Sequence, residues 1–580
     1  MCGITGMLDY ARGANAAAID PFTDALTHRG PDGRGTWCSG PIALGHRRLA
    51  ILDPTPAGAC PMVYTAPDGS VLRITFNGEI YNFLELREEL RREGYTFVTD
   101  TDTEVIAAAW HCWGAACQTK LNGMWAFALW NERSRTLVLS RDRFGVKPLY
   151  LLAQGTTVSF ASEIKAFLSL PGFHGRLNRE AASAFFRNPS AYDGISQSTA
   201  LDGVLRVPAG HSLTITSDGT RGFERWWDTA AQLPAVPIAY DEQVAAFREL
   251  FLDAVRLRMR SDVAIGTSLS GGLDSGAVAS AMAEVARTTP DGALARCASD
   301  WQRTFIATFP GHAVDERTYA DLVVAHTGAK PTYWSFHPDA ALRDLPASVW
   351  ALDDLSAAPA VPILNIYRTM RQHGVVVTLD GHGGDELLAG YPWYRDVAPS
   401  ALNDALYRDF HSTHLPSILR NYDGCSMANG VEVRSPFMDW RLVTYAMALP
   451  GEAKLTPDYT KQILRDALVG ILPEGIRTRV SKLGFESPLV SWANGALGRV
   501  LLAASRTDAW REAPDAAQAS EVTRIVAERT RARAWTEGDR VAAAFAYRLL
   551  NYVLWCEQFA GAGTHITAML SGTPALARAG

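Results

Sequence analysis

The stretch Val263-Ala-Ile-Gly-Thr-Ser-Leu-Ser-Gly-Gly-Leu-Asp-Ser275 begins as an apolar strand, continues into a glycine-rich turn and ends where a helix of small residues begins. The same order recurs further along the chain, where Val375-Val-Val-Thr-Leu379 runs into a second turn, Gly381-His-Gly-Gly384. Two such units predict a parallel α/β sheet that binds a ligand at the carboxyl ends of its strands. Backbone N–H groups of the first turn and the N-terminus of the following helix favour an anionic ligand.

The rest of the chain divides into regions of different character. Residues 2–213 contain short strands and a few helices, including an alternating strand at 72–76, an amphipathic helix at 83–93 capped by Asn82, and a hairpin of 125–130 with 136–140. Residues 214–240 contain two prolines and the Trp226-Trp227 pair, and we predict a connector there. Residues 241–560 alternate helices with apolar strands, and the Gly/Ala-rich residues 561–580 are predicted to form a frayed tail.

Length and composition exclude several classes of protein. The 580 residues correspond to two to four domains at about 150 residues each, and a composition of 47% hydrophobic and 20% charged residues is typical of globular enzymes. The formal charge of −6 argues against a nucleic-acid or anionic-membrane partner. No apolar run approaches the ~18–20 residues of a membrane span, and the first residues do not resemble a secretory signal. Eight scattered cysteines favour the reducing cytoplasm.

Cys2 is the first candidate for chemistry. Removal of Met1 would leave Cys2 with a free α-amine, whose ordinary pKa of about 7.7–8.0 suits a base acting on its own thiol. A bare Met-Cys start is more often structural, but here a series of motifs follows it. In chain order they are MCGI at 1–4, HRGPDG at 28–33, HRRL at 46–49, NGEIYN at 77–82, DTDTE at 100–104 and RDRFGVKPLY at 141–150.

This series resembles the class II glutamine amidotransferase domain, an N-terminal-nucleophile fold in which two β-sheets lie between helix layers, over about residues 2–213. The resemblance implies that Cys2 attacks the glutamine carboxamide and that the Asn77 side chain and the Gly78 N–H bind the oxyanion. It also implies a glutamine-binding set in which a guanidinium binds the α-carboxylate and acids face the ammonium. These residues are Arg48, Ile51, Asn77, Gly78, Glu79 and Asp102.

The second signature is the turn Ser270-Gly-Gly-Leu-Asp-Ser275. It is not a Walker A loop, because the chain contains no Gly-Lys dipeptide. Together with LDGHGGDELLAGY at 379–391, EVRSPFMD at 432–439, KQILR at 461–465 and RVSKLGF at 479–485, it resembles the synthetase half of asparagine synthetase B over residues 241–560. The fold implied is a Rossmann-like parallel sheet with extra helices, of the type that splits ATP between the α and β phosphates.

The resemblance assigns ATP and Mg²⁺ as cofactors. Asp274 and Asp385 would hold Mg²⁺, which uses few protein carboxylates, and Lys482 would neutralise phosphate charge during adenylation. Asp315 matches an acid near the nucleotide. The implied ATP-binding residues are Ser268, Leu269, Ser270, Gly271, Gly272, Asp274, Ser275, Ala307, Asp380 and Gly381.

Both halves in one chain imply one overall reaction. Glutamine is hydrolysed to glutamate and ammonia, a carboxylate acceptor is activated as its acyl-adenylate, and ammonia displaces AMP to form an amide. Because ammonium is not a nucleophile, we expect an internal passage for ammonia through the domain interface. Relatives of this kind are often homodimers, so a second copy is an expected partner.

Three positions on the acceptor side differ from the family pattern. His382 stands where the best-known members have an acid, Ala358 where they have an arginine for aspartate, and Gly424 where they commonly have a basic residue. An unpaired acceptor charge would be costly if buried. Two acceptors therefore stay open: aspartate bound by other contacts, and a larger natural-product carboxylic acid. We predict a functional role for His382, because a loop of glycines offers it little core to pack against.

Three other functions compete with this interpretation. A synthetase without glutaminase activity would be expected to lack Cys2. A glutamine-dependent sugar-phosphate or ribosyl amidotransferase would share the first domain alone, and the turn at 270–275 argues against it. The third is a non-catalytic interaction protein, and Cys2→Ala tests it: if glutamine-dependent amide formation survived this change, the assignment of Cys2 as nucleophile would fail.

Overall fold

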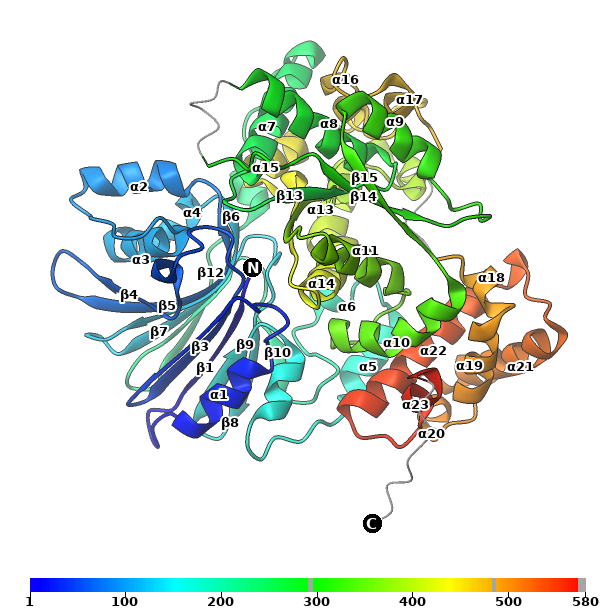
Figure 1. The fold of residues 1–580 in the computed structure, drawn as a ribbon, viewed down its shortest axis with the longest axis horizontal. Helices are drawn as coiled ribbons and strands as arrows, with labels where there is room; N and C mark the ends of the chain where they lie inside the picture. Colours follow the sequence, from blue (N-terminus) through cyan, green and yellow to red (C-terminus); the bar gives the residue numbers. More distant parts are fainter. Residues whose placement is uncertain (290–295, 482–486, 572–580) are drawn as a thin grey trace.

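The computed structural model describes residues 1–289, 296–481 and 487–571. A β-rich N-terminal half, blue to cyan in Figure 1, lies beside a C-terminal half built on one parallel sheet. Within the described residues, no helix combines the length and the apolar character needed to cross a membrane.

Two antiparallel sheets form the N-terminal half, each with six strands within the described residues. The first has the order β10-β8-β9-β1-β3-β2 and the second β12-β11-β7-β6-β5-β4. The strands of the first are β1 (Gly3–Leu8), β2 (Gly33–Ser39), β3 (Ile42–Arg48), β8 (Tyr150–Gln154), β9 (Thr157–Ala161) and β10 (Val204–Arg206). Those of the second are β4 (Met62–Thr65), β5 (Val71–Ile80), β6 (Gly123–Asn131), β7 (Thr136–Arg141), β11 (His211–Ile215) and β12 (Arg221–Arg225).

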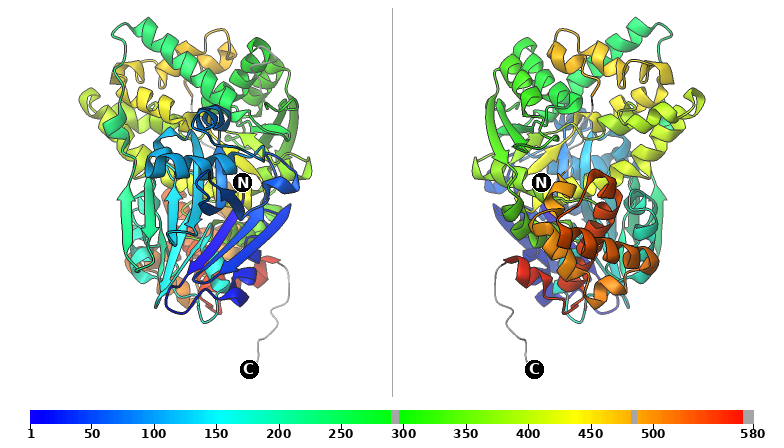
Figure 2. Two further views of the ribbon diagram at one scale, coloured as in Figure 1. Left: turned by 90° about the vertical axis from the view of Figure 1, so that its left-hand side faces the viewer. Right: turned by 90° about the vertical axis from the view of Figure 1, so that its right-hand side faces the viewer.

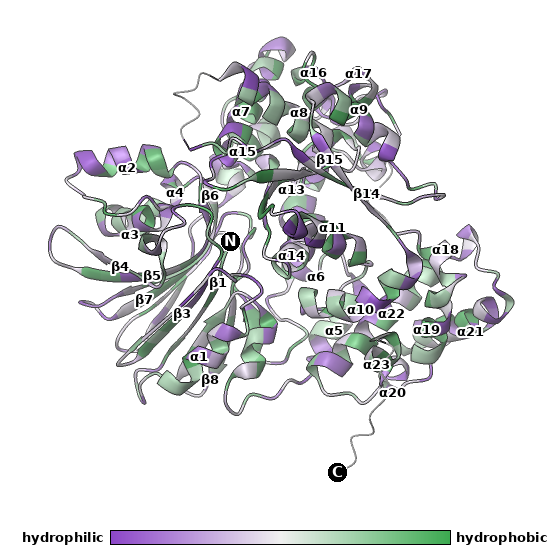
Figure 3. Cartoon of the chain, viewed as in Figure 1, coloured by the Kyte–Doolittle hydropathy of each residue, from purple (hydrophilic) through white to green (hydrophobic). Residues whose placement is uncertain are grey.

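Helices cover the outer faces of both sheets. Helix α1 (Ala16–Asp24) packs on β1 and β3, and α3 (Asp102–Trp113) packs on β4 and β5, while Ile4, Leu44 and Ala128 belong to a buried cluster between the sheets. The result is the expected αββα sandwich. The other helices of this half are α2 (Phe83–Arg92), α4 (Cys117–Lys120), α5 (Arg179–Arg187) and α6 (Tyr192–Ile195). Figure 3 shows α2 with hydrophilic and hydrophobic stretches, in keeping with an amphipathic helix.

A parallel sheet of order β15-β14-β13-β16-β17 organises the C-terminal half. Chain order reverses between β13 and β16, and a ligand of an open α/β sheet binds at the carboxyl ends of strands at such a point. Both glycine-rich turns follow these two strands, as expected. The strands are β13 (Ile265–Ser268), β14 (Arg303–Thr308), β15 (Lys330–Ser335), β16 (Val377–Leu379) and β17 (Glu432–Arg434).

Helices surround this sheet and continue beyond it. Those before and among its strands are α7 (Tyr240–Arg258), α8 (Leu273–Thr288), α9 (Arg317–Thr327), α10 (Pro338–Leu352), α11 (Val361–Gln372), α12 (Gly384–Leu387), α13 (Leu402–His411) and α14 (His414–Met427). Those after it are α15 (Trp440–Ala448), α16 (Gln462–Ala467), α17 (Glu474–Arg477), α18 (Leu489–Ala493), α19 (Ala496–Ala504), α20 (Asp508–Arg511), α21 (Ala516–Ala532), α22 (Arg540–Phe559) and α23 (Ile566–Ser571).

The last helices share a hydrophobic core with the N-terminal half. Phe186 of α5 packs its ring against Tyr552 of α22 at 5.6 Å and against Phe545 at 5.9 Å between centroids. Figure 2 shows these C-terminal helices, orange to red, beside the first half of the chain. The two halves are therefore joined by packing as well as by the chain.

Some local expectations differ from the structure. Asn82 does not cap α2, because its side-chain oxygen accepts a hydrogen bond from the Asn122 N–H at 2.8 Å instead. The predicted connector, residues 214–240, contains β12, which pairs with β11 and so extends the second sheet. A short turn at 216–219 joins these two strands, and its Asp218-Gly219 sequence is as typical of a hairpin as of a linker.

Candidate functional site

Cys2 lies half-buried at the start of β1, beside the strand that carries the predicted oxyanion residues. Its backbone N–H donates to Asn77 Oδ1 at 3.0 Å. Asn77 Nδ2 is buried and has no hydrogen-bond partner among the described residues, so it remains available as an oxyanion donor. Gly78 is required by close packing, because a Cβ there would lie 2.1 Å from the Met124 carbonyl oxygen. Burial raises the pKa of the Cys2 thiol, and the N-terminal amine opposes that rise.

A small pocket of about 40 Å³ brings the predicted glutamine-binding residues together. Arg48 ends β3, and its guanidinium donates to the Thr55 carbonyl at 2.7 Å and to that of Asp53. Asp102 begins α3, accepts the Ile80 N–H at 2.8 Å, and has its pKa raised to about 6 by burial. The predicted residues lining this pocket are Cys2, Arg48, Ile51, Gly78, Glu79 and Asp102.

Two residues of the other half contact residues that line this pocket. The Arg434 guanidinium lies 3.2 Å from Glu79 Oε2 and 2.6 Å from Glu432 Oε1. Glu432 Oε2 in turn accepts a hydrogen bond from the Met1 amine at 2.7 Å. Sequence reasoning missed both Glu432 and Arg434, although they lie in the EVRSPFMD motif, because local sequence does not show which strand edge faces the first half.

The second candidate site lies where the two glycine-rich turns meet. Asp380 Oδ1 accepts the Ser268 N–H at 3.1 Å, so it fixes the start of the first turn. A Cβ at Gly381 would lie 2.8 Å from Asp274, and one at Gly271 would lie 2.8 Å from the Glu316 carbonyl oxygen. The hydroxyls of Ser270 and Ser275 lie 3.0 Å apart across the turn. Nearby, the Leu269 N–H donates to the Phe305 carbonyl of β14, the strand that carries Ala307.

Asp274 and Asp385, the predicted Mg²⁺ ligands, converge on one ammonium group. Lys461 Nζ lies 2.6 Å from Asp385 Oδ1 and also contacts Asp274 Oδ2. Burial alone would lower the pKa of Lys461, but the two carboxylates outweigh it and raise that pKa. Lys461 adopts a left-handed backbone conformation (φ +55°), and a Cβ at Gly390 would lie 2.1 Å from its Cε. Lys461 lies in the KQILR motif, but the sequence did not indicate that its side chain would lie between Asp274 and Asp385.

The carboxylate pair fits Mg²⁺. Both donors are hard oxygens, they are close enough to share one cation, and Mg²⁺ takes one or two carboxylates together with phosphate oxygens and water. No group of three or more His, Cys, Asp or Glu side chains suited to a metal occurs in the part of the chain that the structure describes. The pair would therefore depend on a phosphate ligand to complete the coordination.

Lys482 lies outside the described residues, and the segment before it is anchored at the glycine-rich turn 270–275. Arg479 forms an ion pair of 2.6 Å with Glu316 and donates to the Gly271 carbonyl at 3.1 Å. Its guanidinium also lies 3.7 Å from the centroid of the Tyr319 ring. Asp315 accepts the Arg317 N–H just before α9.

Two of the three positions that depart from the family pattern, His382 and Gly424, lie at α14. The His382 ring packs against Tyr422 at 3.8 Å between centroids, and burial lowers the pKa of His382, which favours the neutral imidazole. Ala358 is exposed. Gly424 has no room for a side chain, because a Cβ there would lie 2.8 Å from the Ala351 carbonyl oxygen of α10. Helix packing thus excludes, at position 424, the basic side chain that family members commonly have there.

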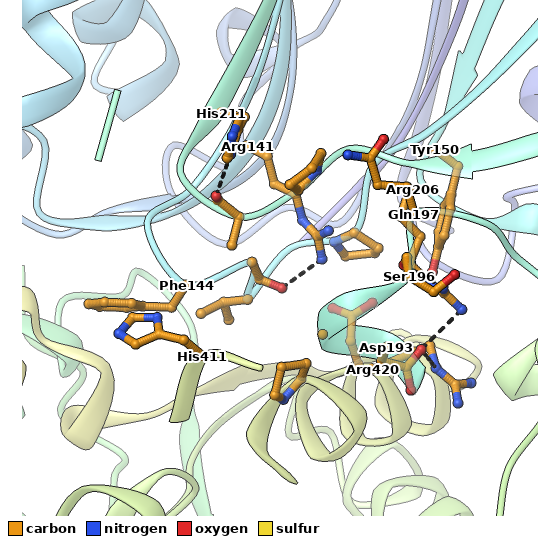
Figure 4. Close-up of a pocket in the computed structure, with 18 of the residues that line it drawn as sticks. Arg141, Phe144, Tyr150, Asp193, Ser196, Gln197, Arg206, His211, His411 and Arg420 are labelled. Atoms are coloured by element: carbon orange, nitrogen blue, oxygen red, sulfur yellow. Dashed lines mark hydrogen bonds and ion pairs between the residues drawn. The ribbon is translucent and has the colours of Figure 1, made fainter. Parts of the chain in front are cut away.

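A larger cavity of about 510 Å³ lies between the two halves (Figure 4). Asp193 of α6 lies 2.8 Å from Arg420 of α14 and 3.1 Å from Arg206 of β10 at its wall. None of the predicted catalytic, glutamine-binding or ATP-binding residues among those described lines this cavity. The candidate chemistry therefore lies elsewhere, in the small pocket at Cys2 and at the paired turns.

Two family models match this chain, one over each half. Residues 1–227 match the family model described as glutamine amidotransferase domain, and residues 246–401 and 397–551 match the model described as asparagine synthase. Among curated relatives, asparagine synthetase (glutamine-hydrolyzing) 1 of Bacillus subtilis (strain 168) is 30% identical, with 88% of this chain and 91% of that protein covered. Asparagine synthetase (glutamine-hydrolyzing) 3 of the same strain is 31% identical, with 83% and 86% covered.

Among solved structures, a glutamine phosphoribosylpyrophosphate amidotransferase from B. subtilis is similar at 17% identity, with a TM-score of 0.30 and 58% of this chain and 81% of that chain covered. The two family models together span most of the chain, in the order that its motifs predict. This chain belongs to the family of glutamine-hydrolysing asparagine synthetases.

Proposed function

We propose that the chain makes an amide from glutamine, ATP and a carboxylic acid, with the two reactions in its two halves. The Cys2 thiolate attacks the glutamine carboxamide, ammonia leaves, and water hydrolyses the thioester to glutamate. In the second half the acceptor carboxylate attacks the α-phosphate of ATP and pyrophosphate leaves. Ammonia then attacks the acyl-adenylate and releases AMP. The observation that carries the proposal is the gathering of Cys2, Gly78, a guanidinium and two acids in one pocket, with Asn77 hydrogen-bonded to Cys2, in a chain that also has the paired glycine turns.

The residues in and beside the first pocket would divide the work of binding and cleaving glutamine. The Asn77 amide and the Gly78 N–H would stabilise the oxyanion, which is worth several kcal/mol for each donor in a dry site. Arg48 would bind the α-carboxylate of glutamine, while Glu79 and Asp102 would bind its ammonium. Removal of Met1 would free the Cys2 amine to act as the base.

An apolar route for ammonia is supported by a cluster at the interface. Met1, Tyr81 and Met124 of the first half pack with Leu257 and Met427 of the second, next to Cys2. An apolar lining favours neutral ammonia over ammonium. Removal of Met1 would also leave space in this cluster. The test is to supply glutamine with ¹⁵N-ammonium in the medium and to measure the source of the amide nitrogen in the product. If nitrogen from the medium freely replaced nitrogen from glutamine, the route would be contradicted.

In the second half, backbone N–H groups of the turn at 270–275 would bind the pyrophosphate, with the adenine beside Ala307 and Gly381. Asp274 and Asp385 would hold Mg²⁺, which neutralises phosphate charge when bound. Lys461 would contact the same phosphates, and Lys482 would act there during adenylation. We also propose the cytoplasm as the location, supported by the absence of disulfides among all eight cysteines.

The acceptor we propose is aspartate, as in the names of the relatives. A larger carboxylic acid is the second candidate, favoured by the lack of room at Gly424 and by the His382–Tyr422 ring pair. A screen of acceptors by pyrophosphate release with glutamine and Mg-ATP separates the two. If aspartate is the acceptor, adding it must raise the rate of pyrophosphate release.

Cys2→Ala tests the whole proposal. Glutamine-dependent amide formation should be lost, while ammonia-dependent formation of amide, AMP and pyrophosphate should continue. Survival of the glutamine-dependent reaction, or formation of ADP and phosphate, would refute it.

A further inference from the structure

We propose that Arg434, a residue of the synthetase half, is a positioning residue for glutamine in the glutaminase half. It holds the Glu79 carboxylate in place, so that its second oxygen can receive the glutamine ammonium. This inference rests on the proposed assignment of Glu79 to that ammonium. It makes glutamine binding depend on a side chain supplied from across the interface.

Two of the three guanidinium nitrogens of Arg434 are held by partners in its own half, and the third faces Glu79. The side chain is fully buried at the end of β17. Its Nε donates to Glu432 at 2.6 Å, and its Nη1 donates to the carbonyl oxygens of Arg258 at 2.8 Å and of Arg260. The remaining nitrogen, Nη2, faces Glu79 Oε2 at 3.2 Å. A guanidinium fixed by so many partners presents a pre-oriented charge to Glu79.

Glu79 itself is arranged as half of an ammonium site. It is 3% exposed and lines the small pocket beside Cys2. Oε2 faces Arg434, while Oε1 is buried and has no hydrogen-bond partner among the described residues. Oε2 is thus paired with the Arg434 guanidinium, and Oε1 is left to accept a hydrogen bond from a donor that enters the pocket.

The charges around Glu79 show why this support matters. Burial raises its pKa well above the ordinary value, and among its neighbours Arg434 opposes this most strongly. Asp102 of α3 and Glu432 of β17 also raise the pKa, and the N-terminal amine lowers it. Without Arg434 the pKa of Glu79 would rise further, and a neutral carboxyl group binds an ammonium ion far less strongly.

Arg434 also connects the small pocket at Cys2 to the two glycine-rich turns. Its carbonyl oxygen accepts the Asp380 N–H at 2.8 Å, and Asp380 in turn holds the Ser268 N–H. The residue that supports the glutamine acid is therefore part of the strand edge on which the second glycine-rich turn is built. No other described arginine or lysine forms an ion pair with Glu79.

The test compares Arg434→Met, Arg434→Lys and Glu79→Gln in the full-length enzyme. Arg434→Met should raise the KM for glutamine about 10- to 100-fold, the usual value of a hydrogen bond to a charged group, with ammonia-dependent amide formation nearly unchanged. The defect should shrink as pH rises, because Glu79 regains its charge. Arg434→Lys should restore part of the affinity.

The outcomes separate this inference from the proposed function. If Glu79→Gln leaves the KM for glutamine unchanged, the assignment of Glu79 fails. If Glu79→Gln raises that KM but Arg434→Met does not, or if Arg434→Met lowers glutamine- and ammonia-dependent rates equally at every pH, the positioning role fails. Should Arg434→Met not fold, the pH dependence of the glutamine KM in Arg434→Lys decides: a profile identical to that of the wild type refutes the inference.

Discussion

Replacing Lys461 by methionine removes the ammonium that Asp274 and Asp385 share. The three side chains are 4%, 15% and 19% exposed, so the two carboxylates would face each other with little solvent to screen them. Removing one partner of a buried charge pair typically costs about 3–5 kcal/mol, and the partial exposure here places the cost near the lower end, at about 3 kcal/mol. For the C-terminal half of about 320 residues, with an unfolding entropy of about 2.1 cal/mol/K per residue, that corresponds to a fall in Tm of roughly 4–5 °C.

The assay is thermal unfolding of the Lys461→Met variant with and without Mg²⁺, in the absence of nucleotide. Because Mg²⁺ can replace the lost ammonium, it should restore much of the Tm of the variant while changing the wild type little. Lys454→Met is the matched control, since Lys454 is equally buried but its Nζ donates to the neutral Asn403 side chain at 2.7 Å. A loss in Lys461→Met no larger than in this control, or no response to Mg²⁺, would refute the argument.

Three further predictions concern single residues. Because the pKa of Asp102 is raised to about 6, the carboxylate loses its charge as pH falls through 6, and the KM for glutamine should rise below that pH; a flat KM from pH 7.5 to 5.5 would contradict this. Gly424→Ala should destabilise the protein by about 1–3 kcal/mol in chemical denaturation, because its Cβ would lie 2.8 Å from the Ala351 oxygen, whereas Gly222→Ala, with open space around it, should be neutral. His382→Asn should change the KM for the acceptor several-fold and leave glutaminase activity intact, and an unchanged acceptor KM would rule out contact with the acceptor.

Local sequence was sufficient for features that a single segment defines. The turn at 270–275 follows β13 and leads into α8, and the second turn follows β16, as the strand–glycine–helix pattern predicts. The set of side chains around Cys2 was predicted by the resemblance to a known family rather than by local sequence. The proposed roles of these residues stay predictions, as does that of Lys482.

Contacts across the interface could not be predicted in the same way. Whether Arg434 faces Glu79 depends on how the third sheet lies against the second, and periodicity within either segment contains no such information. Lys461 shows the same limit, since its left-handed backbone and the space left by Gly390 decide its direction. The lack of room at Gly424 likewise results from the packing of α10 against α14.

The packing of α22 on α5 has a consequence for biosynthesis. The phenyl ring of Phe186 leaves the ribosome several hundred residues before its partner Tyr552, which at ordinary rates of elongation is an interval on the order of tens of seconds. Throughout that interval Phe186 lacks the α22 rings of Phe545 and Tyr552 against which it packs. The core that α5 shares with the C-terminal helices is therefore completed only after the last long helix has been translated.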